Sequence, residues 1–120
     1  MRPGEGGLER KLRVGIIGCG AMGQNHIKAY GLLEDVVEIA ALCDFNAERL
    51  QSAAQDWPAA RTAADCATLL GPADLDLVSV CTMPQTHCEI TVAALEAGAN
   101  VLCEKPFAMD LAQADQMLDA

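Results

Sequence analysis

The stretch that most constrains the fold of this 120-residue chain is Gly18-Cys19-Gly20-Ala21-Met22-Gly23. It follows the apolar run Leu12–Ile17, whose continuous hydrophobicity is typical of a strand buried on both faces of a parallel sheet. A helical pattern begins directly after it. A strand, a G-x-G-x-x-G turn and a helix in this order are the signature of a unit that binds a dinucleotide.

Each part of this glycine loop (residues 18–23) has a predicted task. Gly18 allows the tight turn, Gly20 lets the backbone approach a pyrophosphate, and Gly23 lets the helix pack closely on the strand. The N–H groups around Ala21 and Met22 begin the helix, so we expect them to point at the phosphates, whose charge the helix dipole favours. A glycine cluster alone is a weak signal, because it also marks ordinary turns.

A carboxylate after the next strand supplies the second half of the signature. Residues Val37–Cys43 predict a strand, and Asp44 follows it, 21 residues after Gly23 (44 − 23). This is close to the spacing of about 20 expected for an acid that binds a ribose hydroxyl. The alternative is that Asp44 only ends a strand. A carboxylate repels the 2′-phosphate of NADP, so NAD is the favoured cofactor, with NADP as the second choice. Arg49 would have to approach that phosphate, but a solvated position on the next helix is the favoured interpretation.

The rest of the chain alternates between strand and helix patterns. Strands are predicted at residues 12–17, 37–43, 60–62, 75–81 and 100–103. Helices are predicted at residues 21–33, 47–55, 65–70, 86–97 and from 111 onward, with Asn46 and Asp110 as N-caps of the second and the last. Such alternation predicts an α/β fold with a doubly wound parallel sheet, the Rossmann fold.

Apolar residues at helical spacing predict which face of each helix packs inward. In chain order these faces comprise Met22, His26, Ala29, Tyr30 and Leu33; Ala47, Leu50 and Ala54; Ile90, Ala93, Ala94 and Ala97; and Leu111, Ala114 and Leu118. His26 is interpreted as a helix histidine beside the sheet rather than as a site residue.

Four segments that are distant in sequence fall at the carboxyl ends of the predicted strands. They are the glycine loop, Asp44, residues 82–87 and Glu104-Lys105-Pro106. Ligands of doubly wound sheets bind beyond these strand ends, near the point where the strand order reverses. The sequence therefore predicts one site at this edge of the sheet.

Composition excludes several other classes of function. A net charge of −9 with only 8 Lys and Arg argues against a nucleic-acid partner. No apolar run approaches the ~20 residues of a membrane span. Residues 1–10 are polar and glycine-rich, which predicts a disordered leader rather than a signal peptide, followed by one domain at residues 11–120. We expect a cytoplasmic protein.

The chain has six cysteines, at positions 19, 43, 66, 81, 88 and 103. None forms a C-x-x-C pair and none has zinc-finger spacing with histidine, so no metal site is predicted. The favoured interpretation is that they are small buried hydrophobic residues. The alternative is thiol sensitivity at the edge of the cofactor.

Residues 18–23, Cys43-Asp44, residues 82–87, Ala97-Gly98 and Val101-Leu102-Cys103-Glu104-Lys105-Pro106 together resemble the nucleotide-binding domain of the Gfo/Idh/MocA family (glucose-fructose oxidoreductase, inositol dehydrogenase and rhizopine catabolism). The Glu-Lys-Pro sequence is the specific part of this resemblance, and the glycine loop is the generic part. The resemblance implies NAD(P)-dependent hydride transfer to or from a sugar, a cyclitol or a related polyol.

The resemblance also implies roles for residues of the Glu-Lys-Pro sequence. Lys105 would reach the nicotinamide and the substrate, where its charge can stabilise a developing oxyanion. Glu104 would either hydrogen-bond the cofactor or pair with Lys105. The Lys-Pro peptide bond is often cis in the family, and we expect it to be so here.

In the other loop, the resemblance implies that Thr82, Pro84 and His87 lie along the cofactor. One departure from the family is visible in this loop. Met83 stands where the family has proline directly after the threonine, and Pro84 comes one place later. The contacts of this loop are therefore the least specified part of the predicted site.

Members of the family carry a second domain after this one, which covers the substrate and supplies a His/Asp base. We therefore expect this chain to be the first part of a longer enzyme that forms homo-oligomers through the second domain. Two alternatives stay open: a nucleotide-binding module without catalysis, and an NAD-dependent glycoside hydrolase of the same family.

Overall fold

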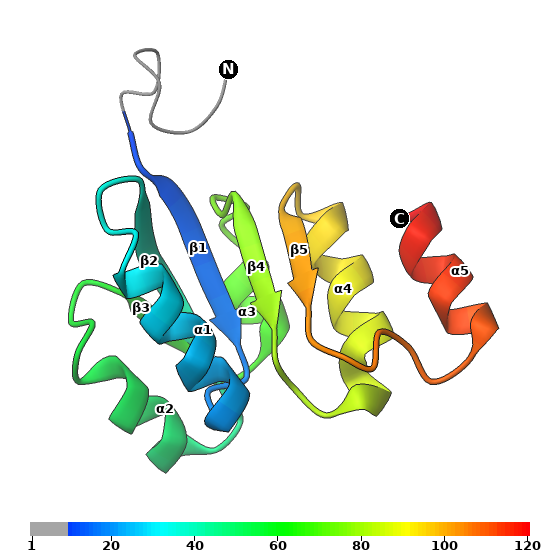
Figure 1. The fold of residues 1–120 in the computed structure, drawn as a ribbon, viewed down its shortest axis with the longest axis horizontal. Helices are drawn as coiled ribbons and strands as arrows, with labels where there is room; N and C mark the ends of the chain where they lie inside the picture. The colour runs from blue at the N-terminus through cyan, green and yellow to red at the C-terminus, as the bar shows by residue number, and fades with distance from the viewer. Residues whose placement is uncertain (1–9) are drawn as a thin grey trace.

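The computed structural model describes residues 10–120, which form a five-stranded parallel sheet flanked by helices (Figure 1). The strands are β1 (Leu12–Ile17), β2 (Val37–Cys43), β3 (Arg61–Ala63), β4 (Leu77–Val80) and β5 (Asn100–Cys103). The helices are α1 (Ala21–Gly31), α2 (Ala47–Ala54), α3 (Cys66–Leu70), the short 3-10 helix η1 (Pro84–Thr86), α4 (His87–Glu96) and α5 (Leu111–Asp119). This order confirms the predicted doubly wound α/β fold. The expected leader at residues 1–10 lies outside the described residues except for Arg10.

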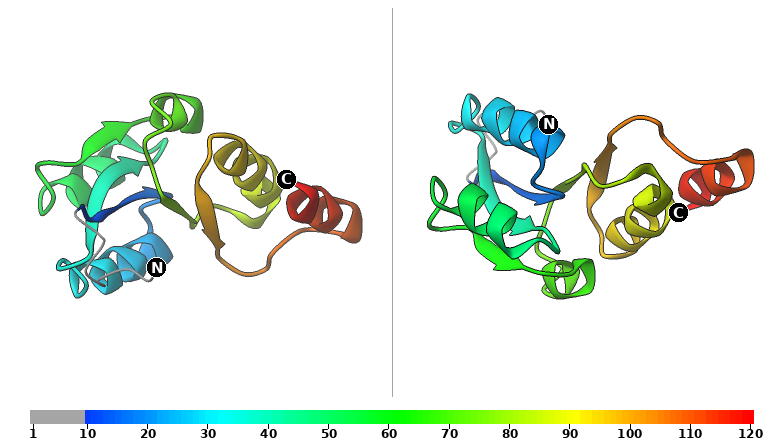
Figure 2. Two further views of the ribbon diagram at one scale, coloured as in Figure 1. Left: turned by 90° about the horizontal axis from the view of Figure 1, so that it is seen from above. Right: turned by 90° about the horizontal axis from the view of Figure 1, so that it is seen from below.

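The sheet has the strand order β3-β2-β1-β4-β5, with every neighbouring pair parallel. Side chains of successive β1 residues enter opposite core layers, because neighbours in a strand point to opposite faces. Ile16 packs in the layer that α1 and α2 cover, and Ile17 packs in the layer that α3 and α4 cover. The views along the sheet show these helices on its two sides (Figure 2). No helix within residues 10–120 is long and apolar enough to cross a membrane.

Most element bounds agree with the sequence, and the differences have local causes. β1, β2 and β5 have the predicted ranges, and Asn46 and Asp110 cap α2 and α5 by accepting N–H bonds. β3 begins one residue later than predicted, and β4 is shorter at both ends. α4 begins at His87, since the preceding residues form the tighter helix η1.

The buried face of α1 differs from the predicted one. Its buried residues are Gly23, Ile27 and Tyr30. Met22 and Leu33 were expected to face inward but are 44% and 51% exposed. The reason is the contact between helix and loop: a Cβ on Gly23 would collide with the Gly18 carbonyl oxygen. This contact fixes the rotation of the helix and turns Met22 outward.

The predicted face of α5 is also wrong. Leu111 and Leu118 are 83% and 73% exposed, and Met117 is the buried residue of the helix. α5 packs on α4 rather than on the sheet (Figures 1 and 2). A helix with one neighbour buries one narrow stripe, and Met117 occupies it.

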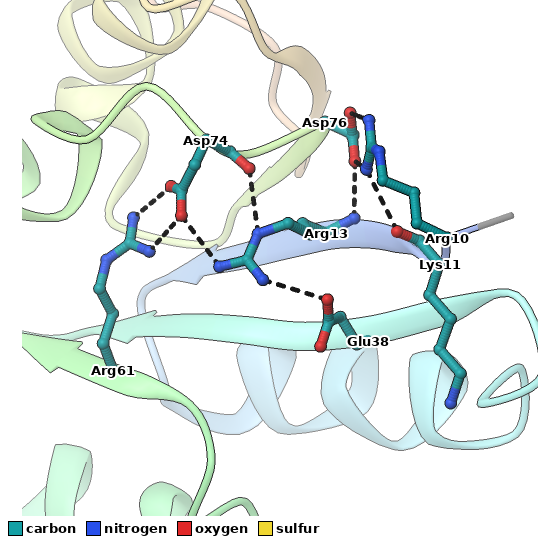
Figure 3. A network of polar contacts seen from close by, with 7 residues as sticks. All are labelled: Arg10, Lys11, Arg13, Glu38, Arg61, Asp74 and Asp76. Atoms are coloured by element: carbon teal, nitrogen blue, oxygen red, sulfur yellow. Dashed lines mark hydrogen bonds and ion pairs between the residues drawn. The ribbon is translucent and has the colours of Figure 1, made fainter.

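Charged side chains join the strands at the amino ends of the sheet (Figure 3). Asp74 accepts hydrogen bonds from Arg61 at 2.8 and 2.9 Å and from Arg13 at 2.9 Å. Asp76 accepts from Arg10 at 2.7 and 3.0 Å and from the backbone N–H of Arg13. The hydrogen bond from Arg61 lowers the pKa of Asp74, and that from Arg10 lowers the pKa of Asp76. This network stabilises the end of the sheet opposite to the predicted site.

Candidate functional site

A pocket of about 390 Å³ lies beyond the carboxyl ends of β1, β2 and β4. Of the predicted site residues, its wall includes Gly18, Gly20, Asp44 and Thr82. Three of the four predicted segments therefore contribute to the pocket: the glycine loop, Asp44 and residues 82–87. The other predicted residues do not line it: Ala21, Met22, Gly23, Pro84, His87, Glu104 and Lys105.

Glycine is required at two positions of the loop for reasons of space. Gly18 has a φ of +98°, and a Cβ there would lie 2.7 Å from the backbone carbonyl of Cys81. Gly23 lies against the Gly18 carbonyl, as described above. Gly20 differs, because a Cβ on it would meet only the side chain of Arg49, at 3.4 Å. The packing of the fold therefore does not require glycine at position 20.

Helix α1 begins in this loop without a side-chain cap. Helices α2, α3 and α5 each have one, from Asn46, Asp65 and Asp110. The first turn of α1 contains no acidic residue either. Its N–H donors are thus available to an anion beside Gly20, and the helix dipole favours one there.

Asp44 supports the glycine loop directly. Its side chain is buried, and Oδ2 accepts a 2.9 Å hydrogen bond from the backbone N–H of Cys19. Oδ1 accepts a second bond, of 2.8 Å, from the N–H of Asn46. Each carboxylate oxygen has two acceptor sites, so Asp44 can still accept a hydroxyl in the pocket.

Arg49 is solvated, as expected, and it also lines the pocket. Its Nη1 lies 3.9 Å from Oδ2 of Asp44, and its guanidinium group covers Gly20. The side chain is about half exposed, because it lies across the mouth of the pocket. The Arg49 side chain points toward Asp44 because the buried carboxylate attracts its positive charge.

The loop at residues 82–87 has its own hydrogen bonds. The Thr86 hydroxyl donates to the Met83 carbonyl at 2.7 Å, so it accepts from the Thr82 hydroxyl at 2.6 Å. Met83, the departure from the family pattern, is 62% exposed and lines the pocket. Pro84 begins the short helix η1 behind it.

His87 lies behind the pocket rather than on its surface. Its side chain has 0% exposure, and its two ring nitrogens contact the carbonyls of Thr82 at 3.0 Å and Pro106 at 2.8 Å. His87 therefore joins the residue 82–87 loop to the Glu-Lys-Pro turn. The Lys105-Pro106 peptide bond in that turn is cis, as expected.

Glu104 has a side-chain partner that the sequence did not suggest. Its Oε2 accepts a 2.8 Å hydrogen bond from Nε2 of His26, which also lowers the pKa of Glu104. The other ring nitrogen of His26 contacts Ser79 at 3.0 Å, and Ser79 contacts the Tyr30 hydroxyl at 2.5 Å. His26 lies beside the sheet, as the sequence predicted, since Ser79 belongs to β4. Its hydrogen bond to Glu104 is the contact that sequence reasoning missed, and no local signal in the sequence indicates it.

Lys105 is exposed, and within residues 10–120 no hydrogen bond or ion pair holds its ammonium group. Contacts of both neighbouring residues hold its backbone in place. The Glu104 carboxylate bonds to His26, and the Pro106 carbonyl contacts His87.

The fold and the pocket together define a nucleotide-binding α/β domain. Residues 12–120 match the family model described as "Oxidoreductase family, NAD-binding Rossmann fold" (GFO_IDH_MocA), and the chain belongs to this family.

Two curated relatives are 37% and 39% identical to the chain. D-apiose dehydrogenase of Paraburkholderia graminis is 37% identical over 111 residues, which are 92% of this chain and 29% of that protein. Inositol 2-dehydrogenase 3 of Saccharopolyspora erythraea is 39% identical over 109 residues, which are 91% of this chain and 32% of that protein. The chain thus spans about a third of the length of these relatives.

Solved structures agree with this result. The WlbA dehydrogenase from Bordetella pertussis, in complex with NADH and UDP-GlcNAcA, superposes with a TM-score of 0.87 at 32% identity, over 92% of this chain and 33% of that one. Levoglucosan dehydrogenase, in complex with NADH and L-sorbose, gives a TM-score of 0.82 at 29% identity, over 91% of this chain and 31% of that one.

Proposed function

We propose that this chain is the nucleotide-binding part of an NAD-dependent oxidoreductase that transfers hydride between the nicotinamide and a sugar, a cyclitol or a related polyol. The observation that carries the proposal is the hydrogen bond from Cys19 N–H to Asp44 Oδ2. It links the glycine loop to the predicted ribose acceptor within one pocket at the carboxyl edge of the sheet. A turn for phosphate and an acid for ribose are the two halves of a dinucleotide site.

The residues present fit a dinucleotide. In our proposal the amides of Gly18, Gly20, Ala21 and Met22 bind the diphosphate at the uncapped start of α1. Gly23 allows the helix to reach that position, and Asp44 binds the ribose. The bound NAD supplies the hydride acceptor. The buried charge of Asp44 favours NAD over NADP, because it would repel a 2′-phosphate.

The loop residues have distinct parts in this proposal. Thr82 borders the cofactor directly, since it lines the pocket. Pro84 and His87 act from behind: Pro84 starts η1, and His87 fixes the loop to the Glu-Lys-Pro turn. Glu104 holds the turn to α1 through His26.

Lys105 is the proposed catalytic residue of this domain. Removal of hydride from an alcohol carbon leaves an oxygen that must lose its proton and on which negative charge develops. The Lys105 ammonium can donate a hydrogen bond to that oxygen and stabilise its charge. The fixed backbone on both sides of Lys105 supports this role, because a positioned donor costs little reorganisation.

The substrate class, the assembly and the location of the whole enzyme are part of the same proposal. The named activities of the relatives, on D-apiose and inositol, support a polyhydroxylated substrate. We propose that a following domain covers that substrate and forms the contacts of a homo-oligomer. Six free cysteines support a reducing compartment such as the cytoplasm.

Titration of the 120-residue chain with NADH, followed by fluorescence, tests the proposal. We expect saturable binding with one site per chain, with NADH bound more tightly than NADPH. A folded chain that binds neither nucleotide would contradict the proposal. Circular dichroism on the same sample establishes that the chain is folded.

A further inference from the structure

The wall of the nucleotide pocket carries three cysteines from three different elements. Cys43 ends β2, Cys66 begins α3 and Cys81 follows β4. All three are free thiols. The hydride transfer proposed above uses none of them, so their gathering at the pocket calls for a separate explanation.

Two of these thiols are neighbours. Cys43 and Cys66 line the same pocket, and Cys66 packs against the core cluster that contains Cys43. Cys43 is 2% exposed, whereas Cys66 is half-buried. A reagent that enters the pocket therefore reaches Cys66 more readily than Cys43.

The surroundings of the three thiols also favour reaction at Cys66. The neighbouring Cys43 thiol lowers the pKa of Cys66, although burial and the charges of Asp65 and Glu89 act against it. Burial raises the pKa of Cys81 to about 12. The neighbouring Cys66 and burial raise the pKa of Cys43. Because the thiolate is the nucleophilic form and Cys66 is more exposed than Cys43, we expect Cys66 to be the first of the three to react.

We propose that Cys66 and Cys43 form a redox-active thiol pair whose reaction with a low-molecular-weight disulfide excludes the nucleotide from the pocket. This inference rests on the proposed function, since it takes the pocket to be the nucleotide site. The chemistry needs only the two protein thiols and the small disulfide, RSSR.

The reaction has two steps. The Cys66 thiolate attacks one sulfur of RSSR, so the S–S bond of the reagent breaks, a Cys66–SR mixed disulfide forms, and RS⁻ leaves and takes up a proton. Cys43 then loses its proton and attacks the Cys66 sulfur, which forms the Cys43–Cys66 disulfide and releases the second RSH. Overall, the two protein thiols are oxidised by two electrons to one disulfide. RSSR accepts these two electrons and is reduced to two RSH.

The exclusion follows from the shared space. In the mixed disulfide, the R group occupies part of the 390 Å³ pocket in which the nucleotide would lie. Conversely, a bound nucleotide covers Cys66 and keeps the reagent away from it. Coupling between two ligands is reciprocal, so each lowers the occupancy of the other.

Oxidised glutathione is a suitable probe for the reduced 120-residue chain, with intact mass and peptide mapping as the readouts. We expect the first adduct on Cys66, followed by loss of the glutathione mass and a Cys43–Cys66 crosslink. Saturating NADH slows this reaction by about tenfold or more, since only the thiol of the unoccupied fraction reacts.

Three variants sharpen the experiment. Cys66→Ser removes the reaction, and Cys43→Ser stops it at the mixed disulfide on Cys66. Cys88→Ser is the matched control: this thiol lies between α4 and α5, 3.7 Å from the Gln113 carbonyl and away from the pocket, so this variant reacts like the parent chain.

Several results would overturn the inference. One is that the Cys66→Ser variant reacts with oxidised glutathione as fast as the parent chain. The others are that the first adduct forms on another cysteine, or that saturating NADH leaves the reaction rate unchanged. The NADH affinity of the reduced chain is measured first. If that chain does not bind NADH, the proposed function and this inference both fail. If it binds NADH but Cys66 is not protected, only the inference fails.

Discussion

The Glu104 carboxylate accepts a 2.8 Å hydrogen bond from Nε2 of His26, a residue 78 positions earlier in the chain. A carboxylate only accepts, so Nε2 carries the proton. In the neutral ring Nδ1 then accepts from Ser79, whose oxygen accepts from the Tyr30 hydroxyl. This chain of hydrogen bonds connects the helix that begins at the glycine loop to the turn that carries Lys105.

The first prediction concerns His26→Ala. The hydrogen bond from His26 is the main reason why the pKa of Glu104 lies below the ordinary 4.5, so this variant raises that pKa toward 4.5. An NMR titration of the Glu104 carboxyl measures the change. Tyr30→Phe is the control, because it removes only the distant hydroxyl and leaves the pKa of Glu104 low. An unchanged pKa in His26→Ala would contradict the assigned partner.

Gly20 and Gly23 differ in what an added methyl group meets, so alanine at each has a different effect. In Gly23→Ala the Cβ collides with the Gly18 carbonyl, and we expect a loss of about 2 kcal/mol or more in the free energy of unfolding. In Gly20→Ala the Cβ meets only Arg49, so stability stays within about 0.5 kcal/mol. NADH affinity nevertheless falls about tenfold, since the methyl group keeps the phosphates from the backbone. Urea unfolding and NADH titration measure both; unchanged affinity in Gly20→Ala would contradict the phosphate role.

Asp44→Asn tests the choice of cofactor. The amide keeps one acceptor oxygen but puts an NH₂ group against one backbone N–H, either that of Cys19 or that of Asn46, at a cost of about 1–3 kcal/mol in stability. We expect NADH affinity to fall about tenfold and NADPH affinity to fall much less, because the repulsion of a 2′-phosphate is removed. Parallel titrations with the two nucleotides give the ratio. Asp110→Asn, at another helix cap, is the control with unchanged affinities; equal losses for both nucleotides in Asp44→Asn would refute the ribose role.

Lys105→Ala separates cofactor binding from catalysis. Lys105 does not line the pocket, so NADH affinity of the variant stays within about twofold. In the complete enzyme kcat falls by about 100-fold or more, as is typical when a donor to a developing oxyanion is removed. Steady-state kinetics measure kcat, and a loss of NADH affinity as large as the loss of kcat would contradict the role.

Acid stability tests the network at the other end of the sheet. Arg61 and Arg10 hold the pKa values of Asp74 and Asp76 below the ordinary 3.8 in the folded chain. The unfolded chain therefore takes up protons first, so the stabilisation is complete above about pH 4–5 and is lost as pH falls through the folded pKa values. Urea unfolding between pH 7 and pH 3 measures this. Asp74→Asn lowers stability at pH 7 by about 1 kcal/mol and flattens the pH dependence; an equally steep dependence in this variant would contradict the prediction.

The sequence predicts the strands and the pocket walls well because their signals are local. The strands β1 and β2 are continuous apolar runs, and the glycine loop and Asp44 follow them directly. Parallel pairing then brings the ends of these strands to one edge without further information. For this reason Gly18, Gly20, Asp44 and Thr82 were predicted together and are found in one wall.

What the sequence misses depends on contacts between distant residues. Hydrophobicity does not distinguish Met22, which points outward, from Ile27, which packs inward; the contact of Gly23 with Gly18 decides between them. No spacing rule relates His26 to Glu104. The direction of Arg49 likewise depends on the buried Asp44 carboxylate, which attracts it across the pocket mouth.

The burial of His87 has a consequence for how the site moves. One ring, with no surface of its own, contacts the backbone on the cofactor side at Thr82 and on the lysine side at Pro106. The two flanks of the site are thus a single mechanical unit. A displacement of one flank when a nucleotide enters carries the other with it, so we expect loading of the domain and alignment of Lys105 to occur in the same motion.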